Sequence, residues 1–379
     1  MTDSWIITNV KTQTAGGFGM QDLAIRNGCF TTSVSPDMRR FDADGLIAMP
    51  GIIDLHGDGF ERHIAPRNGV EFDLETALLA TDRELLANGI TTAFLALTIS
   101  WEPGPRSLQR ARDTIAALVR LRPRLKTEIR LQIRWEIFAL EAVPDIESWL
   151  DLDPSPTLAF NDHLTAICSG MKPHILAKNA ARCGMSVEAY RADLDRLSAR
   201  AKEVPLAVRH LADMAAAKGV ICFAHDEQTP QERDKNRGIG ITVCEFPITA
   251  DTAKAAIANG EATVLGAPNV LRGKSHTGAV DATEAIHAGL CSVLASDYYY
   301  AAPLAAMARL GSSDPEQMAK FWPLISANAA AAVGLDDRGH IAPDYQADFL
   351  LYHMQDNHPQ MVAVFRKGEC IHLLEPWRV

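Results

Sequence analysis

Four side chains able to bind a metal ion occur within eight residues near the start of the chain: His56, Asp58, Glu61 and His63. They follow or end a short apolar run at Ile52-Ile53, bounded by a Pro-Gly pair, which predicts a buried strand. His56 and Asp58 are two positions apart, so on a strand one imidazole and one carboxylate point to the same side and can meet. The alternative is an ordinary polar loop after a strand. This stretch predicts part of a metal site, which residues elsewhere must complete.

Later apolar runs also end in residues of the kind that bind metals, and from them we select Glu136, His163, His225 and Asp297. Imidazole combined with carboxylate suits Zn²⁺, Mn²⁺ or Fe²⁺, and a ligand set without thiolates is typical of catalytic sites. Histidines on either side of a bridging carboxylate can hold two ions about 3.5–4 Å apart, which activate water near neutral pH. Each residue alone has a structural alternative, such as a strand-end histidine or a helix cap. Together with His56 and Asp58 they favour a metal site of one or two ions.

A loop punctuated by glycines, Gly266 to Gly278, contains five further candidates for substrate binding: Asn269, Arg272, Lys274, Ser275 and His276. Glycines let a backbone approach a ligand closely, and arginine with lysine can neutralise phosphate charge. The alternative is a solvated basic loop. Two residues of the first loop are added to this set, Arg67 for its charge and His63 as a proton donor. These residue types predict a phosphorylated small-molecule substrate.

Strands and helices must position these residues, and the chain alternates between them from residue 49 to 334. After the opening run, strand candidates are ITTAFLAL, LQIRWEIF, TLAFND, VICFAH, ITVCEF, ATVLGA and CSVLAS, most of them separated by helical stretches. One such helix is expected to begin after Asp73 and to stop at Gly89. About eight strands predict an α/β fold of the (β/α)₈ TIM-barrel type, with chemistry at the carboxyl ends of the strands. An open doubly wound sheet would be expected to show a Gly-rich phosphate turn, and neither GxGxxG nor GxxxxGK[ST] occurs after a strand.

The two ends of the chain are both rich in strand-like runs. Residues 1–48 contain WIITNVKTQ, QDLAIRNGCF and LIAMP, and residues 335–379 end in a predicted hairpin that turns at Lys367-Gly368. We expect these two segments to fold together into a small composite β-sandwich domain beside the barrel.

Composition limits the class of protein. The 379 residues carry a formal charge of −10, which disfavours a nucleic-acid binder. No signal-peptide pattern begins the chain, and no apolar run approaches the roughly 18 residues that cross a membrane. Seven scattered cysteines without a CxxC pair suit a reducing compartment. We expect a cytoplasmic protein without a membrane or nucleic-acid partner; homo-oligomer formation stays open.

These motifs resemble those of the amidohydrolase superfamily: PGIIDLH followed by a carboxylate, a histidine after each of two later strands, SD after the last, and the closing GLDDRGHIAPDYQADFLLY. Within it, the chain is similar to the diphosphatases of the carbon–phosphorus lyase pathway, which hydrolyse α-D-ribose 1-methylphosphonate 5-triphosphate. The likeness extends over nearly the whole chain and is carried by LHGDGFERHIAPR, NDH, AHDEQT, EFPIT, GAPNVLRGKSHTG and LASDYYYA. Two segments depart from the family: HGDG replaces HTDN, and NDHLTAICSGMKP replaces a run containing Pro-Gly-Gln-x-Gln.

The resemblance implies the same six metal ligands and assigns roles to two of them. Glu136 takes the position where relatives often carry a carbamylated lysine, and Asp297 is both ligand and proton acceptor. In the superfamily the residue at the position of Glu136 belongs to the fourth barrel strand, whereas Glu136 ends the third strand predicted from the sequence. We therefore expect an additional short strand around Ser100 to Arg106.

We therefore predict a metal-dependent hydrolase, with Zn or Mn as the cofactor, that cleaves a phosphoanhydride of a ribosyl triphosphate and releases pyrophosphate. Activated water, oriented by Asp297, would attack phosphorus while Arg272, Lys274 and His276 stabilise the developing charge. One alternative is hydrolysis of a C–N bond, as in amide or cyclic amide cleavage and deamination, by the same metal site. A non-catalytic amidohydrolase-like scaffold is the other, and the presence of all six ligands disfavours it.

Overall fold

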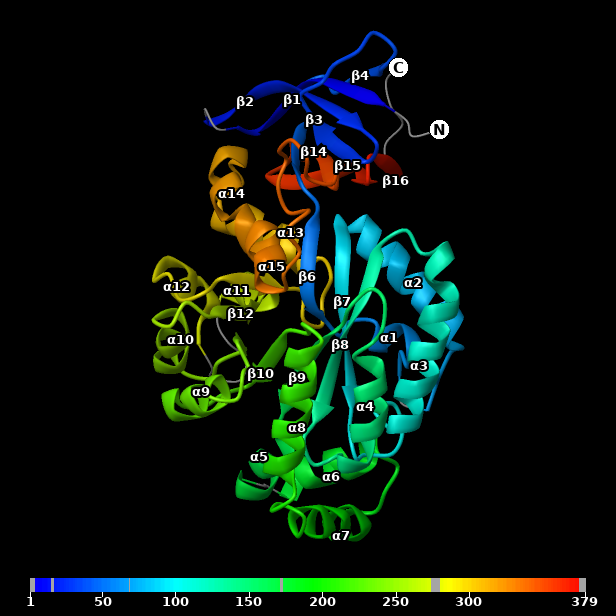
Figure 1. The fold of residues 1–379 in the computed structure, drawn as a ribbon, viewed down its shortest axis with the longest axis vertical. Coiled ribbons are helices and arrows are strands. Elements are labelled where there is room, and N and C mark those ends of the chain that lie inside the picture. Colours follow the sequence, from blue (N-terminus) through cyan, green and yellow to red (C-terminus); the bar gives the residue numbers. More distant parts are fainter. Residues whose placement is uncertain (1–3, 15–16, 68, 171–172, 274–279, 375–379) are drawn as a thin grey trace.

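The computed structural model describes residues 4–14, 17–67, 69–170, 173–273 and 280–374, and it contains two eight-stranded sheets. One sheet is a barrel surrounded by helices, and the other is a mixed sheet at one end of the long axis, built from both ends of the chain (Figure 1). The barrel strands are β6 (Ile52–Gly57), β7 (Ile90–Ile99), β8 (Glu128–Glu136), β9 (Thr157–Asn161), β10 (Cys222–His225), β11 (Val243–Glu245), β12 (Ala262–Gly266) and β13 (Val293–Ala295).

The barrel is parallel throughout, and strands adjacent in sequence are adjacent in the sheet. The last strand returns to the first, because a backbone bridge joins Gly57 to Asp297. Two backbone hydrogen bonds reinforce this junction, from the Asp297 N–H to the His56 carbonyl at 2.8 Å and from the Asp58 N–H to the Asp297 carbonyl at 2.9 Å. These contacts bring the two ends of the sheet together in a near-closed barrel, as the sequence predicted.

The helices that follow the strands cover the outside of the barrel (Figure 1). Their bounds are α1 (Glu61–Ile64), α2 (Leu74–Ala87), α3 (Leu108–Leu121), η1 (Arg122–Arg124), η2 (Leu140–Ala142), α4 (Val143–Trp149), α5 (His163–Gly170), α6 (Pro173–Arg182), α7 (Val187–Ser198), α8 (Val204–Ala217), α9 (Pro230–Arg237), α10 (Ala250–Ile257), α11 (Ala267–Arg272), α12 (Ala282–His287), α13 (Ala302–Leu310), α14 (Pro315–Phe321), η3 (Trp322–Ile325) and α15 (Ala327–Ala332). The Asp73 carboxylate caps α2 by accepting the Thr76 N–H at 2.9 Å, and Gly89 follows the helix with a φ of +76°, as expected.

The mixed sheet has the order β16-β15-β14-β5-β1-β2-β3, with β4 paired to β1. Its strands are β1 (Trp5–Thr14), β2 (Gly17–Arg26), β3 (Cys29–Thr31), β4 (Arg39–Asp42), β5 (Ile47–Pro50), β14 (Phe349–Gln355), β15 (His358–Arg366) and β16 (Glu369–Leu373). The predicted hairpin is confirmed: β15 and β16 are antiparallel, and Lys367 and Gly368 turn between them with positive φ. All eight strands share one hydrogen-bonded sheet, and a domain division at residues 48 and 335 stays a prediction.

A partly buried ionic cluster joins the barrel to the mixed sheet. Glu128, at the start of β8, lies 2.7 Å from an Arg130 nitrogen and 2.9 Å from an Arg338 nitrogen. An Arg366 nitrogen, at the end of β15, lies 3.5 Å from the second carboxylate oxygen. Because β8 begins at this cluster and ends at Glu136, the mixed sheet lies at the opposite end of the barrel from the predicted site.

The expected strand between Ser100 and Arg106 does not occur. Ser100 makes only an isolated bridge to Ser107, and the eight barrel strands are complete without it. Glu136 therefore ends the third strand of the barrel. No helix within the described ranges is both long and apolar enough to cross a membrane.

Candidate active site

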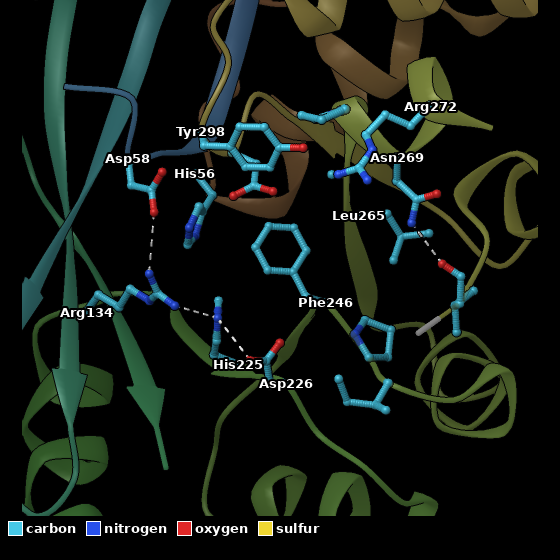
Figure 2. Close-up of a pocket in the computed structure, with 16 residues that line it drawn as sticks. His56, Asp58, Arg134, His225, Asp226, Phe246, Leu265, Asn269, Arg272 and Tyr298 are labelled. Carbon is cyan, nitrogen blue, oxygen red and sulfur yellow. Dashed lines mark hydrogen bonds and ion pairs between the residues drawn. The ribbon is translucent and has the colours of Figure 1, made fainter. Parts of the chain in front are cut away.

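A pocket opens at the carboxyl ends of the barrel strands, where the sequence predicted the chemistry. His56, Asp58, His225 and Asp297 line it together with Arg134. Phe246 packs edge-on against the His56 and His225 rings, Tyr298 lies beside His56, and Asn269 and Arg272 lie on the far side of Phe246 (Figure 2). The cavity holds about 320 Å³, which is within the range typical of small-molecule sites.

Glu245, at the end of β11, holds two of the predicted metal ligands in place. Its carboxylate oxygens lie 3.0 Å from His56 Nδ1 and 2.7 Å from His225 Nδ1. Burial alone would raise the pKa of this fully buried carboxyl, but the two imidazoles outweigh it and hold the pKa well below its usual range. An ionised carboxylate only accepts, so both Nδ1 atoms donate, and Nε2 is the atom of each ring that could bind a metal. A carboxylate that fixes the tautomer in this way is typical of metal-binding histidines.

Asp297 comes close to His56 and Asp58 through the closure of the barrel. One ligand atom from each of these three residues lies within 4.8 Å of the others. Asp297 lies two residues after the end of β13 and has a φ of +56°, a strained value for a residue other than glycine. Burial raises the pKa of Asp297 to about 6. A carboxylate with this pKa can accept a proton near neutral pH.

Glu136 contacts His163 and belongs to none of the metal-capable groups found among the described residues. Its buried carboxylate lies 2.5 Å from His163 Nδ1, and it also accepts the His163 backbone N–H at 3.2 Å. On the other side of the ring, His163 Nε2 lies 3.5 Å from Asp226 Oδ2. Burial lowers the pKa of His163, but Asp226 and Glu136 outweigh it and raise the pKa to about 9. Metal binding at His163 must therefore displace a proton.

Arg134 projects from β8 into the middle of these groups. One guanidinium nitrogen lies 2.7 Å from His225 Nε2, and another lies 3.8 Å from Asp58 Oδ2 (Figure 2). The side chain is buried. Burial and the charge of Arg134 lower the pKa of His225, which keeps this imidazole neutral and able to accept a hydrogen bond.

The glycines of the HGDG motif make room for Tyr300. A Cβ atom at Gly57 would lie 2.6 Å from a Tyr300 ring carbon and 2.6 Å from the Asp54 carboxylate. A Cβ at Gly59 would lie 3.0 Å from the same ring. The buried Tyr300 hydroxyl accepts the Phe60 N–H at 3.1 Å, which fixes the loop that carries Asp58. The HGDG sequence thus has a packing reason in this chain.

The described residues fit a divalent cation. Three groups have ligand atoms that lie within 4.8 Å of one another: His56 with His225 and Glu245, His163 with His225 and Asp226, and His56 with Asp58 and Asp297. The first group is a carboxylate hydrogen-bonded to the Nδ1 atoms of two imidazoles, and it serves to orient the rings. The other two combine imidazole with carboxylate, a donor set that suits Zn²⁺ or Mn²⁺.

The predicted substrate-binding residues divide into three sets. Asn269 and Arg272 line the pocket from α11. Asn269 also closes its own loop, donating to the Val280 carbonyl at 3.1 Å. His63 contacts Glu84 at 2.6 Å and Arg67 is exposed; neither is among the residues that line this pocket. Lys274, Ser275 and His276 lie outside the described residues.

Three residues of the site were not among the predicted ligands: Arg134, Asp226 and Glu245. Asp226 and Glu245 each end an apolar run, which was a usable signal. Arg134 alternates with Gln132 and Glu136 along β8, so period-two geometry puts all three on one face.

Glu61, the third metal-capable residue of the first motif, does not join the site. It pairs with Arg106 through two contacts of 3.1 and 2.9 Å.

Comparison with known proteins gives one relative of nearly equal length. The chain is 28% identical to the α-D-ribose 1-methylphosphonate 5-triphosphate diphosphatase of Escherichia coli strain K12, over 96% of this chain and 99% of that protein. No model of a protein family matches.

Solved structures share the fold along their whole length. N-isopropylammelide isopropylaminohydrolase from Burkholderia multivorans superposes with a TM-score of 0.66 at 17% identity, covering 97% of this chain and 98% of that one. The 5-methylcytosine deaminase from Klebsiella pneumoniae gives a TM-score of 0.62 at 14% identity, covering 99% and 98%.

Proposed function

Since the chain belongs to the amidohydrolase superfamily of metal-dependent hydrolases, we propose that it is a diphosphatase that releases pyrophosphate from a ribosyl triphosphate. The full-length similarity to the Escherichia coli enzyme supports the substrate class, a ribose 5-triphosphate with a methylphosphonate at carbon 1. Within the described residues the seven cysteines form no disulfide, which supports a place for this reaction in the reducing cytoplasm.

The observation that carries the proposal is a carboxylate base and a cationic side chain in one pocket. Asp297 lies with His56 and Asp58 on one side, and Arg272 reaches the same cavity from the end of α11. Arginine binds phosphoryl oxygens in a bidentate manner, which suits the middle of a triphosphate chain. An amide or cyclic amide would not need this positive charge.

The proposed reaction is attack of water on the phosphorus attached to the ribose oxygen. A divalent cation held by His56, Asp58 and Asp297 would act as a Lewis acid toward water and the phosphoryl group. Asp297 accepts the proton of the attacking water, and its pKa of about 6 suits that role near neutral pH. Arg272 stabilises the negative charge that develops on the phosphoryl oxygens. The bond to the bridging oxygen breaks and pyrophosphate leaves, needing little help from a general acid.

The test is release of phosphate and pyrophosphate from a panel of ribosyl and nucleoside triphosphates in the presence of Zn²⁺ or Mn²⁺. We expect pyrophosphate from ribosyl triphosphates, and a loss of about 10²-fold or more in kcat/KM for Arg272→Ala, of the order found for removal of one transition-state donor. Arg209→Ala is the matched control, because this exposed arginine pairs with Asp213 on α8 and does not line the pocket.

The same variants distinguish hydrolysis of a C–N bond. A metal-loaded protein that is silent on every triphosphate, but hydrolyses an amide or cyclic amide equally well with and without Arg272, would overturn the proposal.

A further inference from the structure

Arg134 is a buried cation that lies between the two groups able to bind a catalytic metal. A guanidinium stays charged in proteins, so its burial requires negative partners. One of its nitrogens lies 3.8 Å from Asp58, which belongs to the group with His56 and Asp297. Another donates to His225 Nε2 at 2.7 Å, and His225 belongs to the group with His163 and Asp226. The guanidinium therefore bridges the two groups (Figure 2).

The contact with His225 removes a ligand atom from the second group. Because Glu245 receives the Nδ1 proton of His225, Nε2 is the only lone pair that the ring can offer a metal. The hydrogen bond from Arg134 uses that lone pair. The Asp226 carboxylate lies 3.5 Å from this Nε2 and 3.5 Å from His163 Nε2.

Charge opposes a second metal ion at the same place. A divalent ion bound by His225 Nε2 and Asp226 would lie next to the fixed positive charge of Arg134, because the guanidinium contacts that same Nε2 at 2.7 Å. The group of His56, Asp58 and Asp297 keeps one imidazole Nε2 and two carboxylates, and its contact with the guanidinium is the longer one, 3.8 Å at Asp58 Oδ2.

We infer that Arg134 takes the place of a second metal ion, so that this chain binds one catalytic cation, at His56, Asp58 and Asp297. The inference rests on the metal-dependent part of the proposed function and not on the identity of the substrate. Arg134 is a positioning residue in this account, because it holds His225 and the carboxylates in the arrangement that a second ion would otherwise impose.

The experiment is a titration of the metal-free protein with Mn²⁺, without substrate, followed by calorimetry, metal analysis and electron paramagnetic resonance. The wild type is expected to bind one equivalent, with the spectrum of an isolated ion. Arg134→Met removes the charge at similar side-chain length and is expected to bind two equivalents that are magnetically coupled, as ions about 4 Å apart are. Arg134→Lys keeps the charge and is expected to bind one.

Two tightly bound equivalents in the wild type would overturn the inference, as would a folded Arg134→Met protein that still binds one. Circular dichroism and thermal unfolding check the fold of each variant. If Arg134→Met does not fold, Arg134→Leu, which neither donates to His225 nor carries a charge, replaces it, and two equivalents are again expected. Since no triphosphate is present, failure here is separate from failure to release pyrophosphate.

Discussion

His56 Nδ1 lies 3.0 Å from Oε1 of Glu245, although 189 residues separate them in the chain. The other oxygen of the same carboxylate lies 2.7 Å from His225 Nδ1. One buried carboxylate thus sets the tautomer and orientation of two imidazoles, and the metal site depends on a residue that need not touch the metal.

Removal of this orienting contact is expected to weaken metal binding. Glu245→Gln should lower the affinity for Zn²⁺ about 10–100-fold. The amide carries no negative charge, and only its oxygen can accept a hydrogen bond, so it cannot accept from both rings. Competition with a chromophoric chelator measures the change. Gln132→Ala is the control, since Gln132 also contacts Glu245, at 2.7 Å, but does not touch either histidine. Equal affinities for wild type and Glu245→Gln would contradict this role.

The activity should rise with pH as Asp297 loses its proton. A general base acts only in its ionised form, and burial raises the pKa of Asp297 to about 6. A bound cation favours the ionised carboxylate, so the inflection in kcat/KM is expected at or below about pH 6. Asp297→Asn should lower kcat by about 10²–10⁴-fold and remove the inflection. If Asp297→Asn kept the wild-type kcat and the inflection, another residue would have to be the base.

The HGDG motif offers a test of packing rather than chemistry. Gly57→Ala is expected to destabilise the metal-free protein by about 1–3 kcal/mol, because the new methyl group would overlap the Tyr300 ring and the Asp54 carboxylate. Urea unfolding in a chelating buffer measures it. Gly19→Ala is the matched control, because a Cβ at Gly19 meets nothing within 4 Å. Truncation of Tyr300 to Leu should recover part of the loss at Gly57; equal stability of the two alanine variants would refute the explanation.

The junction between the barrel and the mixed sheet should depend on pH. Burial raises the pKa of Glu128, but Arg338 and Arg130 outweigh it and lower the pKa from 4.5 to about 2. This difference corresponds to about 3 kcal/mol, present in full above pH 4.5 and lost as the pH falls toward 2. Glu128→Gln should therefore be less stable than the wild type at pH 7, and the gap should shrink between pH 4.5 and 3. A gap in unfolding free energy that does not change with pH would contradict this.

The fold could be predicted from sequence because its signals are local. The barrel strands are short apolar runs bounded by turn residues, and the hairpin at Lys367-Gly368 needs only two residues that tolerate positive φ. That His56, Asp58 and Asp297 lie together could be predicted for the same reason, since each is at or just beyond the carboxyl end of a strand and barrels bring strand ends together.

Partners distant in sequence could not be predicted in the same way. Glu245 and His56 meet only when the first and sixth strands face each other inside the barrel. His63 lies close to the HGDG motif in sequence, but the short helix α1 carries its ring to Glu84 on α2. Arg134 occurs in an apolar run. Its charge lies between two metal-capable groups only because the whole barrel curves, which the local sequence does not show.

We propose that this pocket hydrolyses a ribosyl triphosphate with the help of a divalent cation. The most direct measurement is phosphorus NMR of α-D-ribose 1-methylphosphonate 5-triphosphate incubated with metal-loaded wild type and with Asp297→Asn. We expect the wild type to release one pyrophosphate per triphosphate, and we expect a chelator or the Asp297→Asn substitution to abolish this release. An unchanged triphosphate spectrum with a fully metal-loaded, folded protein would contradict it.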